Sequence, residues 1–215
     1  MESQKPKIAM YVKRPFGEKL NASFDFLKEN WKLLLKFTTY LLLPLCLIQA
    51  LSLNGLMSGA LSISAIASST AMAASSSSLI AFGSYYGLYM FLYLIGIILL
   101  TSLVYGLIRT YNEREERLQG VTLGMLKPRL FRNIKRLLLM TGACILLVLF
   151  VGIFVGLLVA LTPFTLFLTI PFIIAFSVPL ALLAPIYLFE DITLMVAFKK
   201  TLRLGFATWG GVFLV

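Results

Sequence analysis

The sequence predicts an all-α, polytopic transmembrane helix bundle, and the distribution of its charged residues is the main reason. Hydrophobic residues make up 60% of the 215 residues and charged residues only 13%, which is not the composition of a soluble globular domain. Every charged residue lies in one of three clusters, 1–36, 109–136 and 190–203, with net charges of +4, +5 and +1. The clusters are separated by long apolar segments.

Those segments, 37–108 and 137–189, contain 72 and 53 residues without a charge. A helix that crosses the bilayer takes about 20 apolar residues, so each segment holds two spans and a turn. Two spans return the chain to the side it left, which places all three basic clusters on one face. The positive-inside rule makes this face the cytoplasm. We therefore expect a multi-pass protein of the cytoplasmic (inner) membrane with its N-terminus in the cytoplasm, and no nucleic-acid partner.

The predicted fold is built from repeated units, each a cytoplasmic amphipathic helix followed by a membrane hairpin. A polar arm, 1–16, precedes the first unit, 17–118. This unit opens with apolar residues at helical spacing, which predicts an amphipathic helix in the lipid headgroup region; the alternative is a soluble helix packed on a protein core. Its polar face carries lysines four residues apart. The residues expected to contact anionic lipid there are Lys28, Trp31, Lys32 and Lys36.

The first unit continues with two spans, about Leu33–Leu53 and Leu79–Ile108. Pro44 lies at the middle of the first span and predicts a kink. The segment between the spans, Asn54–Ser78, is rich in serine and alanine and predicts an outer loop. Its centre, Leu61–Ala74, is weakly apolar, so a loop, a re-entrant helix and an interfacial helix all stay open there.

The second span carries two patterns that suggest helix packing or a groove. Tyr85, Tyr89 and Tyr93 are four residues apart and form one stripe of hydroxyl-bearing rings. The stripe is either the wall of a polar groove or a set of interfacial anchors and interhelical hydrogen bonds. Gly83 and Gly87 form a small-xxx-small pair, which permits close helix approach.

The second unit, 119–189, repeats this order. A stripe of leucines and Ile134 predicts a second amphipathic helix, which Pro128 either breaks or divides. The third span is about Leu137–Leu161, and the fourth, about Phe164–Phe189, should be bent by its prolines and buried against the bundle. The basic residues expected to contact anionic lipid are Arg129, Arg132, Lys135 and Arg136. The residues assigned to helix packing or a broken-helix groove are Gly152, Gly156, Pro171, Pro179 and Pro185.

The third predicted unit, 190–215, is expected to be only the start of a repeat. Glu190 and Asp191 are predicted to open a third amphipathic helix, because acidic residues suit a helix N-terminus. Its apolar face is predicted to contain Met195, Phe198 and Leu202. Its lipid-facing basic residues are Lys199, Lys200 and Arg203.

The repeat is aligned on three polar residues, Asn30, Asn133 and Thr201, each of which precedes an apolar helix by a few residues. After Arg203 the remaining residues are too few to cross the bilayer. We therefore expect four full spans and a truncated fifth, with the natural chain continuing beyond Val215. The alternative is a terminal helix inserted halfway, which leaves backbone groups unsatisfied in lipid.

The third unit also carries a resemblance. The run Ala197-Phe-Lys-Lys-Thr-Leu-Arg-Leu, followed by Trp209-Gly-Gly, resembles a pattern in uncharacterised bacterial multi-pass proteins grouped with the membrane domain of glycerophosphoryl diester phosphodiesterases. The first two units look like weaker copies, so the resemblance spans about 17–215. It implies a non-catalytic bacterial membrane bundle. Nothing here resembles the soluble metal-dependent domain of that enzyme, so no phosphodiesterase activity carries over.

The sequence offers no chemistry for catalysis. It contains no histidine, no metal-ligand spacing and no phosphate-binding loop, and its spans carry no acid or base. Cys46 and Cys144 fall within predicted spans and are expected to be small buried hydrophobes. No cofactor is expected. The leading hypothesis is a non-enzymatic membrane scaffold, anchor or regulatory subunit with a protein partner or a homo-oligomeric state; the alternative is a transporter or lipid-handling bundle that uses the proline-broken fourth span.

Overall fold

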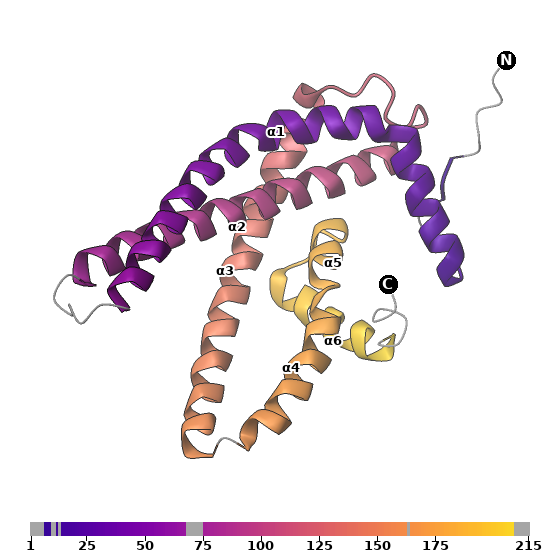
Figure 1. Ribbon diagram of the computed structural model, residues 1–215. Helices are drawn as coiled ribbons and strands as arrows, with labels where there is room; N and C mark the ends of the chain where they lie inside the picture. The colour runs from indigo at the N-terminus through magenta and orange to yellow at the C-terminus, as the bar shows by residue number, and fades with distance from the viewer. Residues whose placement is uncertain (1–6, 10–11, 13, 68–74, 163, 209–215) are drawn as a thin grey trace. The chain divides into compact units, whose positions relative to one another are not determined.

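The computed structural model describes residues 7–9, 12, 14–67, 75–162 and 164–208 (Figure 1). Most of these residues form helices and none of them forms a strand, so the prediction of an all-α fold is confirmed. The helices are α1 (Phe16–Ala67), α2 (Ser75–Glu113), α3 (Leu123–Leu161), α4 (Thr165–Leu180), α5 (Leu183–Phe189) and α6 (Leu194–Ala207).

Within the described residues, four stretches are long and apolar enough to cross a membrane, and they correspond to the four predicted spans. They are Phe16–Leu61, Leu79–Glu113, Leu123–Leu161 and Thr165–Phe189. Most apolar side chains of α3 and α4 are exposed, which is the expected arrangement when lipid rather than protein covers them. The chain is therefore a membrane protein. The repeated units and the fifth span stay predictions, and 209–215 lies outside the described residues.

The chain divides into two compact units, Asp25–Leu103 and Met1–Phe24 with Val104–Val215. In the first, α1 and α2 run antiparallel. The ring of Tyr85 lies over Gly55, and a Cβ at Gly59 would lie 3.5 Å from Phe82. Gly96 meets Leu45 further along. Glycines thus let the two helices of this hairpin approach closely, as small residues do between membrane helices.

The predicted outer loop Asn54–Ser78 is wrong over most of its length. Helix α1 continues to Ala67 and α2 already begins at Ser75, and 68–74 lies outside the described residues. Alanine, leucine and methionine favour a helix, and no proline interrupts this stretch. The serines also adapt locally, because the Ser58 and Ser64 hydroxyls donate to carbonyls one turn back. Pro44 does not interrupt α1.

In the second unit, α6 packs against α4 and α5, and α3 contacts both α4 and α5. The fourth span is broken, because α4 ends at Leu180 and α5 begins at Leu183. A small core forms around this break from Leu183, Tyr187 and Ala197, with Cys144 and Phe198 packed against it. The Cys144 side chain is half-buried, whereas Cys46 is exposed, so the expectation that both cysteines are buried fails at Cys46.

The expected burial of the fourth span is also wrong for α4. Of its prolines, Pro179 is buried and Pro171 is exposed, while Pro185 in α5 is half-buried. Phe167 and Leu168 are about four-fifths exposed, at 83% and 78%. Proline removes backbone hydrogen bonds but does not decide whether a helix face has a neighbour, and the first half of α4, which contains Pro171, keeps an exposed apolar surface that suits lipid.

Helix α6 differs from its prediction at both its start and its packed face. It begins at Leu194, so Glu190 and Asp191 lie in the turn before it. Its buried residues are Ala197, Thr201 and Gly205, whereas Met195 is 65% exposed. Small residues four apart, rather than the largest apolar ones, face α4 and α5, because they allow the closest helix approach.

The two small-xxx-small pairs expected from the sequence do not pack within the described residues. A Cβ at Gly83, Gly87, Gly152 or Gly156 would meet open space. Spacing alone does not say which face of a helix has a neighbour. The close approaches occur instead at Gly55, Gly96 and Gly205.

Candidate functional site

A cluster of arginines and carboxylates joins three charged ends of the two apolar runs. It lies in the second compact unit, Met1–Phe24 with Val104–Val215. Its residues come from the last turn of α2, the first turns of α3 and the turn between α5 and α6. Its members are Arg109, Glu113, Arg129, Arg132, Arg136 and Asp191.

Asp191 is the centre of this cluster. One carboxylate oxygen accepts a hydrogen bond from Arg136 at 3.0 Å, and the other accepts one from Arg109 at 3.0 Å. Arg132 lies 3.9 Å from the second oxygen, too far for a hydrogen bond. The backbone of Asp191 has a φ of 52°, in the left-handed region that aspartate tolerates better than most residues. The turn between α5 and α6 is thus bent so that its carboxylate faces the arginines.

Arg136 attaches α3 to that turn. Its guanidinium donates to the carbonyl oxygens of Tyr187 and Ile192 at 2.5 and 2.8 Å. It also lies 4.2 Å above the centre of the Tyr187 ring, a cation–π arrangement. Together with the Asp191 bond, these contacts hold the C-terminal carbonyl of α5 and the following turn against the start of the third span.

Glu113 is the second carboxylate of the cluster. It accepts hydrogen bonds from Arg109, at 3.0 Å, and from Arg129, and Arg129 also donates to the Thr110 hydroxyl at 3.1 Å. Partial burial by itself would raise the pKa of Glu113, but hydrogen bonds from Arg129 and Arg109 outweigh it and lower the pKa below its usual value. These residues follow Ile108, where the apolar run ends.

This lowered pKa predicts how stability depends on pH. The contribution of Glu113 is fully present above its unfolded pKa of 4.5 and is lost as the pH falls through the lower folded value. We expect the melting temperature to fall as the pH is lowered from above this unfolded pKa through the lower folded value. Thermal unfolding in detergent micelles measures this. The melting temperature of Glu113→Gln should fall less steeply with decreasing pH. Equal slopes in the two proteins would assign the loss of stability to other carboxylates.

Two described residues of the N-terminal arm, Lys7 and Ile8, contact the end of α2 beside this cluster. The Lys7 ammonium donates to the carbonyls of Asn112 and Arg114, at 2.7 and 3.1 Å. The Tyr111 hydroxyl accepts the backbone N–H of Ile8 at 3.3 Å, and its ring is buried. An ammonium at a helix C-terminus satisfies orphan carbonyls and suits the helix dipole. Lys7 therefore ties the arm to the end of α2.

Lys7→Gln should loosen that attachment by about 0.5–1 kcal/mol, the usual size of a cation at a helix C-terminus. Hydrogen exchange should accelerate at the amides of 7–9 and of the last turn of α2. Lys127→Gln, which removes one exposed charge on α3, is the control. Equal exchange in wild type and the Lys7 variant would show that the arm is held without the ammonium.

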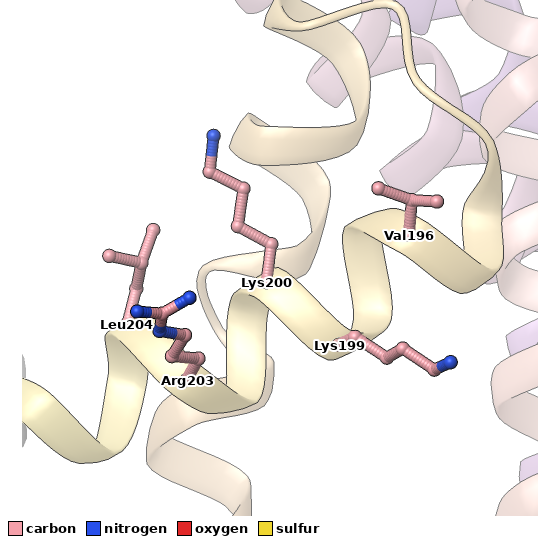
Figure 2. A pocket seen from close by; sticks show the side chains of 5 residues that line it. All are labelled: Val196, Lys199, Lys200, Arg203 and Leu204. Atoms are coloured by element: carbon pink, nitrogen blue, oxygen red, sulfur yellow. The ribbon is translucent and has the colours of Figure 1, made fainter.

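The basic residues of α6 do not converge. A shallow pocket of about 450 Å³ is lined by Val196, Lys199, Lys200, Arg203 and Leu204. Figure 2 shows Lys199 and Lys200 pointing away from one another on opposite sides of the helix. Lys200 is paired with Glu190 at 2.7 Å. This pocket is therefore a stretch of one helix surface and not a preformed anion site.

The predicted interfacial residues of α1 are exposed. Lys28, Trp31, Lys32 and Lys36 all lie on its surface, and the Lys32 ammonium is 6.0 Å from the centre of the Trp31 ring. A shallow pocket of about 320 Å³ beside Trp31 is lined by α1 alone. Contact of these residues with anionic lipid stays a prediction.

The three tyrosines of the stripe on α2 differ in their surroundings, and their role as a groove wall or as anchors stays a prediction. Tyr85 packs on Gly55, Tyr93 is 49% exposed and Tyr89 is half-buried. Among the described residues, no group of three or more histidine, cysteine or acidic side chains is placed to hold a metal ion.

The four basic residues of α3 that were predicted to contact anionic lipid differ in their contacts. Arg129 and Arg136 are bonded within the cluster, whereas Arg132 and Lys135 remain exposed. The sequence patterns did not predict a site that contains Arg109, Glu113 and Asp191. One signal in the sequence could have indicated them. Each lies within five residues of the end of an apolar run, and the arginine after the first run has a charge opposite to that of the aspartate after the second.

Comparison with known proteins adds no family to this description: no protein-family model, curated protein or solved structure matches the chain. The resemblance of the third unit to the membrane domain associated with glycerophosphoryl diester phosphodiesterases therefore stays a prediction.

Proposed function

We propose that this protein is a non-enzymatic scaffold, anchor or regulatory subunit of a bacterial inner membrane, with its charged ends in the cytoplasm. The observation that carries this proposal is the contrast between its apolar runs and their ends. The runs 37–108 and 137–189 contain no charged residue, which leaves no acid or base for a coupled ion pathway. Their ends are bonded to one another through Asp191 and Glu113.

Such an arrangement suits a surface for docking more than a moving gate. The arginine–carboxylate bonds to Asp191 join segments far apart in the sequence, for example Arg109 and Asp191. Bonds of this kind keep the helix ends in one arrangement, and a fixed charged surface is what a partner protein or a second copy of the chain would recognise.

Cysteine labelling tests the topology on which this rests. In a Cys46→Ser, Cys144→Ser background, single cysteines at Glu115, Lys199 and Ser64 are exposed to a membrane-impermeant maleimide in intact cells. We expect labelling at Ser64 only. Labelling at Glu115 or Lys199 from outside would overturn the cytoplasmic placement of the charged ends.

Partner capture tests the scaffold role. Replacing Lys28, Lys32 and Lys36 by glutamine should reduce the recovery of co-purifying proteins from mild detergent. Replacing Tyr89 and Tyr93 by phenylalanine should leave it unchanged. Recovery that depends on the tyrosines and not on the lysines would contradict the proposal.

A lipid-handling function is the second candidate, and the break in the fourth span favours it. Ala197 packs beside Leu183, and Gly205 packs on Pro179, so Thr201 between them faces the break. The Thr201 hydroxyl is buried and has no hydrogen-bond partner among the described residues. In vesicles that contain the reconstituted protein, we expect a fluorescent phosphatidylcholine to move between the two leaflets, and we expect Pro179→Ala to abolish this movement. No lipid movement with the wild-type protein would exclude this candidate.

A further inference from the structure

One guanidinium of the cluster is available to a ligand from outside the chain. The cluster contains four arginines and two carboxylates, a surplus of two positive charges. Arg109, Arg129 and Arg136 each donate hydrogen bonds to a carboxylate. Arg132 makes none within the described residues, and its side chain is 51% exposed. Its donors are therefore the ones that an additional anion would meet.

The position of Arg132 along α3 indicates which anion this is. The apolar run begins at Leu137, five residues further along the helix, which corresponds to about 7–8 Å. The polar headgroup layer on each side of the hydrocarbon is of similar depth, about 5–8 Å. Arg132 thus lies at the level of lipid phosphates, provided that α3 crosses the bilayer as proposed.

The surface below Arg132 is apolar and open. Leu139, Leu146 and Ile153 follow it at intervals of seven residues, so they lie on nearly the same face of α3. Their side chains are exposed. Lys135, also exposed, is three residues from Arg132 and adjacent to it on the helix surface. A cationic group above an exposed apolar stripe matches a phospholipid, in which a phosphate sits above acyl chains.

We propose that Arg132, supported by Lys135, binds the headgroup phosphate of one anionic phospholipid, whose acyl chains lie along Leu139 and Leu146. The planar guanidinium supplies paired donors to two phosphate oxygens, and the surplus charge of the cluster favours an anionic over a zwitterionic headgroup. This inference deepens the proposed function, since it needs the charged ends to lie at the membrane surface but does not need a protein partner.

The test uses the full chain in nanodiscs of phosphatidylcholine with increasing fractions of phosphatidylglycerol, followed by native mass spectrometry of retained lipid. Wild type should retain phosphatidylglycerol in preference to phosphatidylcholine. Arg132→Gln should weaken that preference about fivefold, the factor that corresponds to about 1 kcal/mol per basic residue near the surface. Arg132→Lys should be intermediate, because it keeps the charge and loses the fork.

Lys127→Gln is the matched control. It removes the same charge from the same helix, but at ten residues, or about 15 Å, from Leu137, and should change retention less than twofold. Equal effects of the Lys127 and Arg132 variants would overturn the site in favour of diffuse attraction. Circular dichroism and size-exclusion profiles verify that each variant is folded.

Two further outcomes separate this inference from its alternatives. Inorganic phosphate, compared with chloride at equal ionic strength, should not displace the retained lipid; displacement by phosphate alone would assign the site to a soluble phosphate. Unchanged lipid retention in Arg132→Gln would refute the lipid site while leaving partner capture unaffected. Loss of partner capture with selective lipid retention intact would refute the scaffold role alone.

Discussion

Gly205→Leu is expected to separate α6 from α4 and to lower the free energy of unfolding by about 2–3 kcal/mol. A Cβ at this position would lie 2.5 Å from both Cα and Cβ of Pro179. The obstacle includes backbone, which cannot turn aside as a flexible side chain can. Gly205→Ala should cost less, because about 1 kcal/mol of helix propensity offsets part of the clash.

Unfolding by SDS in mixed micelles, followed by circular dichroism, measures this loss. Gly152→Ala is the control, because a Cβ there meets open space. It should be neutral or stabilising by up to about 1 kcal/mol. If the Gly205 and Gly152 alanine variants have the same stability, the contact between α6 and Pro179 is not the tight one described above.

Asp191→Ala is expected to release the turn between α5 and α6 and to cost about 2–3 kcal/mol. Two causes add. Loss of the carboxylate removes one hydrogen-bond acceptor from Arg109 and one from the partly buried Arg136, which costs about 1–2 kcal/mol after discounting for solvent exposure. Alanine is also strained at a φ of 52°, by about 1 kcal/mol.

Three variants and the same unfolding assay separate these causes. Asp191→Gly removes the carboxylate but adopts a positive φ without strain. Asp191→Asn keeps one side-chain oxygen as an acceptor and tolerates the positive φ. Each should therefore cost less than Asp191→Ala. Glu190→Gln removes the neighbouring charge and an exposed pair with Lys200, and should cost less than about 1 kcal/mol. Equal effects at positions 190 and 191 would show that Asp191 is not the centre of the cluster.

Asp191 also illustrates where prediction from sequence fails. An acidic pair before an amphipathic stretch is typical of a helix N-terminus, so Glu190 and Asp191 were expected to begin the third helix. In the structure the helix begins at Leu194. The bonds to Arg109 and Arg136, which lie 82 and 55 residues away, outweigh a dipole interaction that is worth less than about 1 kcal/mol at an exposed position.

The predictions of an outer loop and of packing glycines were wrong for related reasons. Serine and alanine between two apolar runs are typical of a loop, but α1 continues to Ala67 and packs Gly55 and Gly59 against the facing helix. Among the described residues, glycine pairs in α2 and α3 have the spacing of a packing motif and no neighbour. Glycine spacing shows that a helix face permits close packing. It does not show whether a second helix packs against that face.

The sequence by itself determined that this protein is helical and where its four apolar helices run, because the cost of placing charge in hydrocarbon acts on each stretch of chain separately. Tertiary structure alone decided which basic residues are neutralised, which helix faces touch and how the fourth span is attached. These depend on pairs such as Arg109 with Asp191 and Pro179 with Gly205, whose partners meet only when separate helices pack, so no local pattern encodes them.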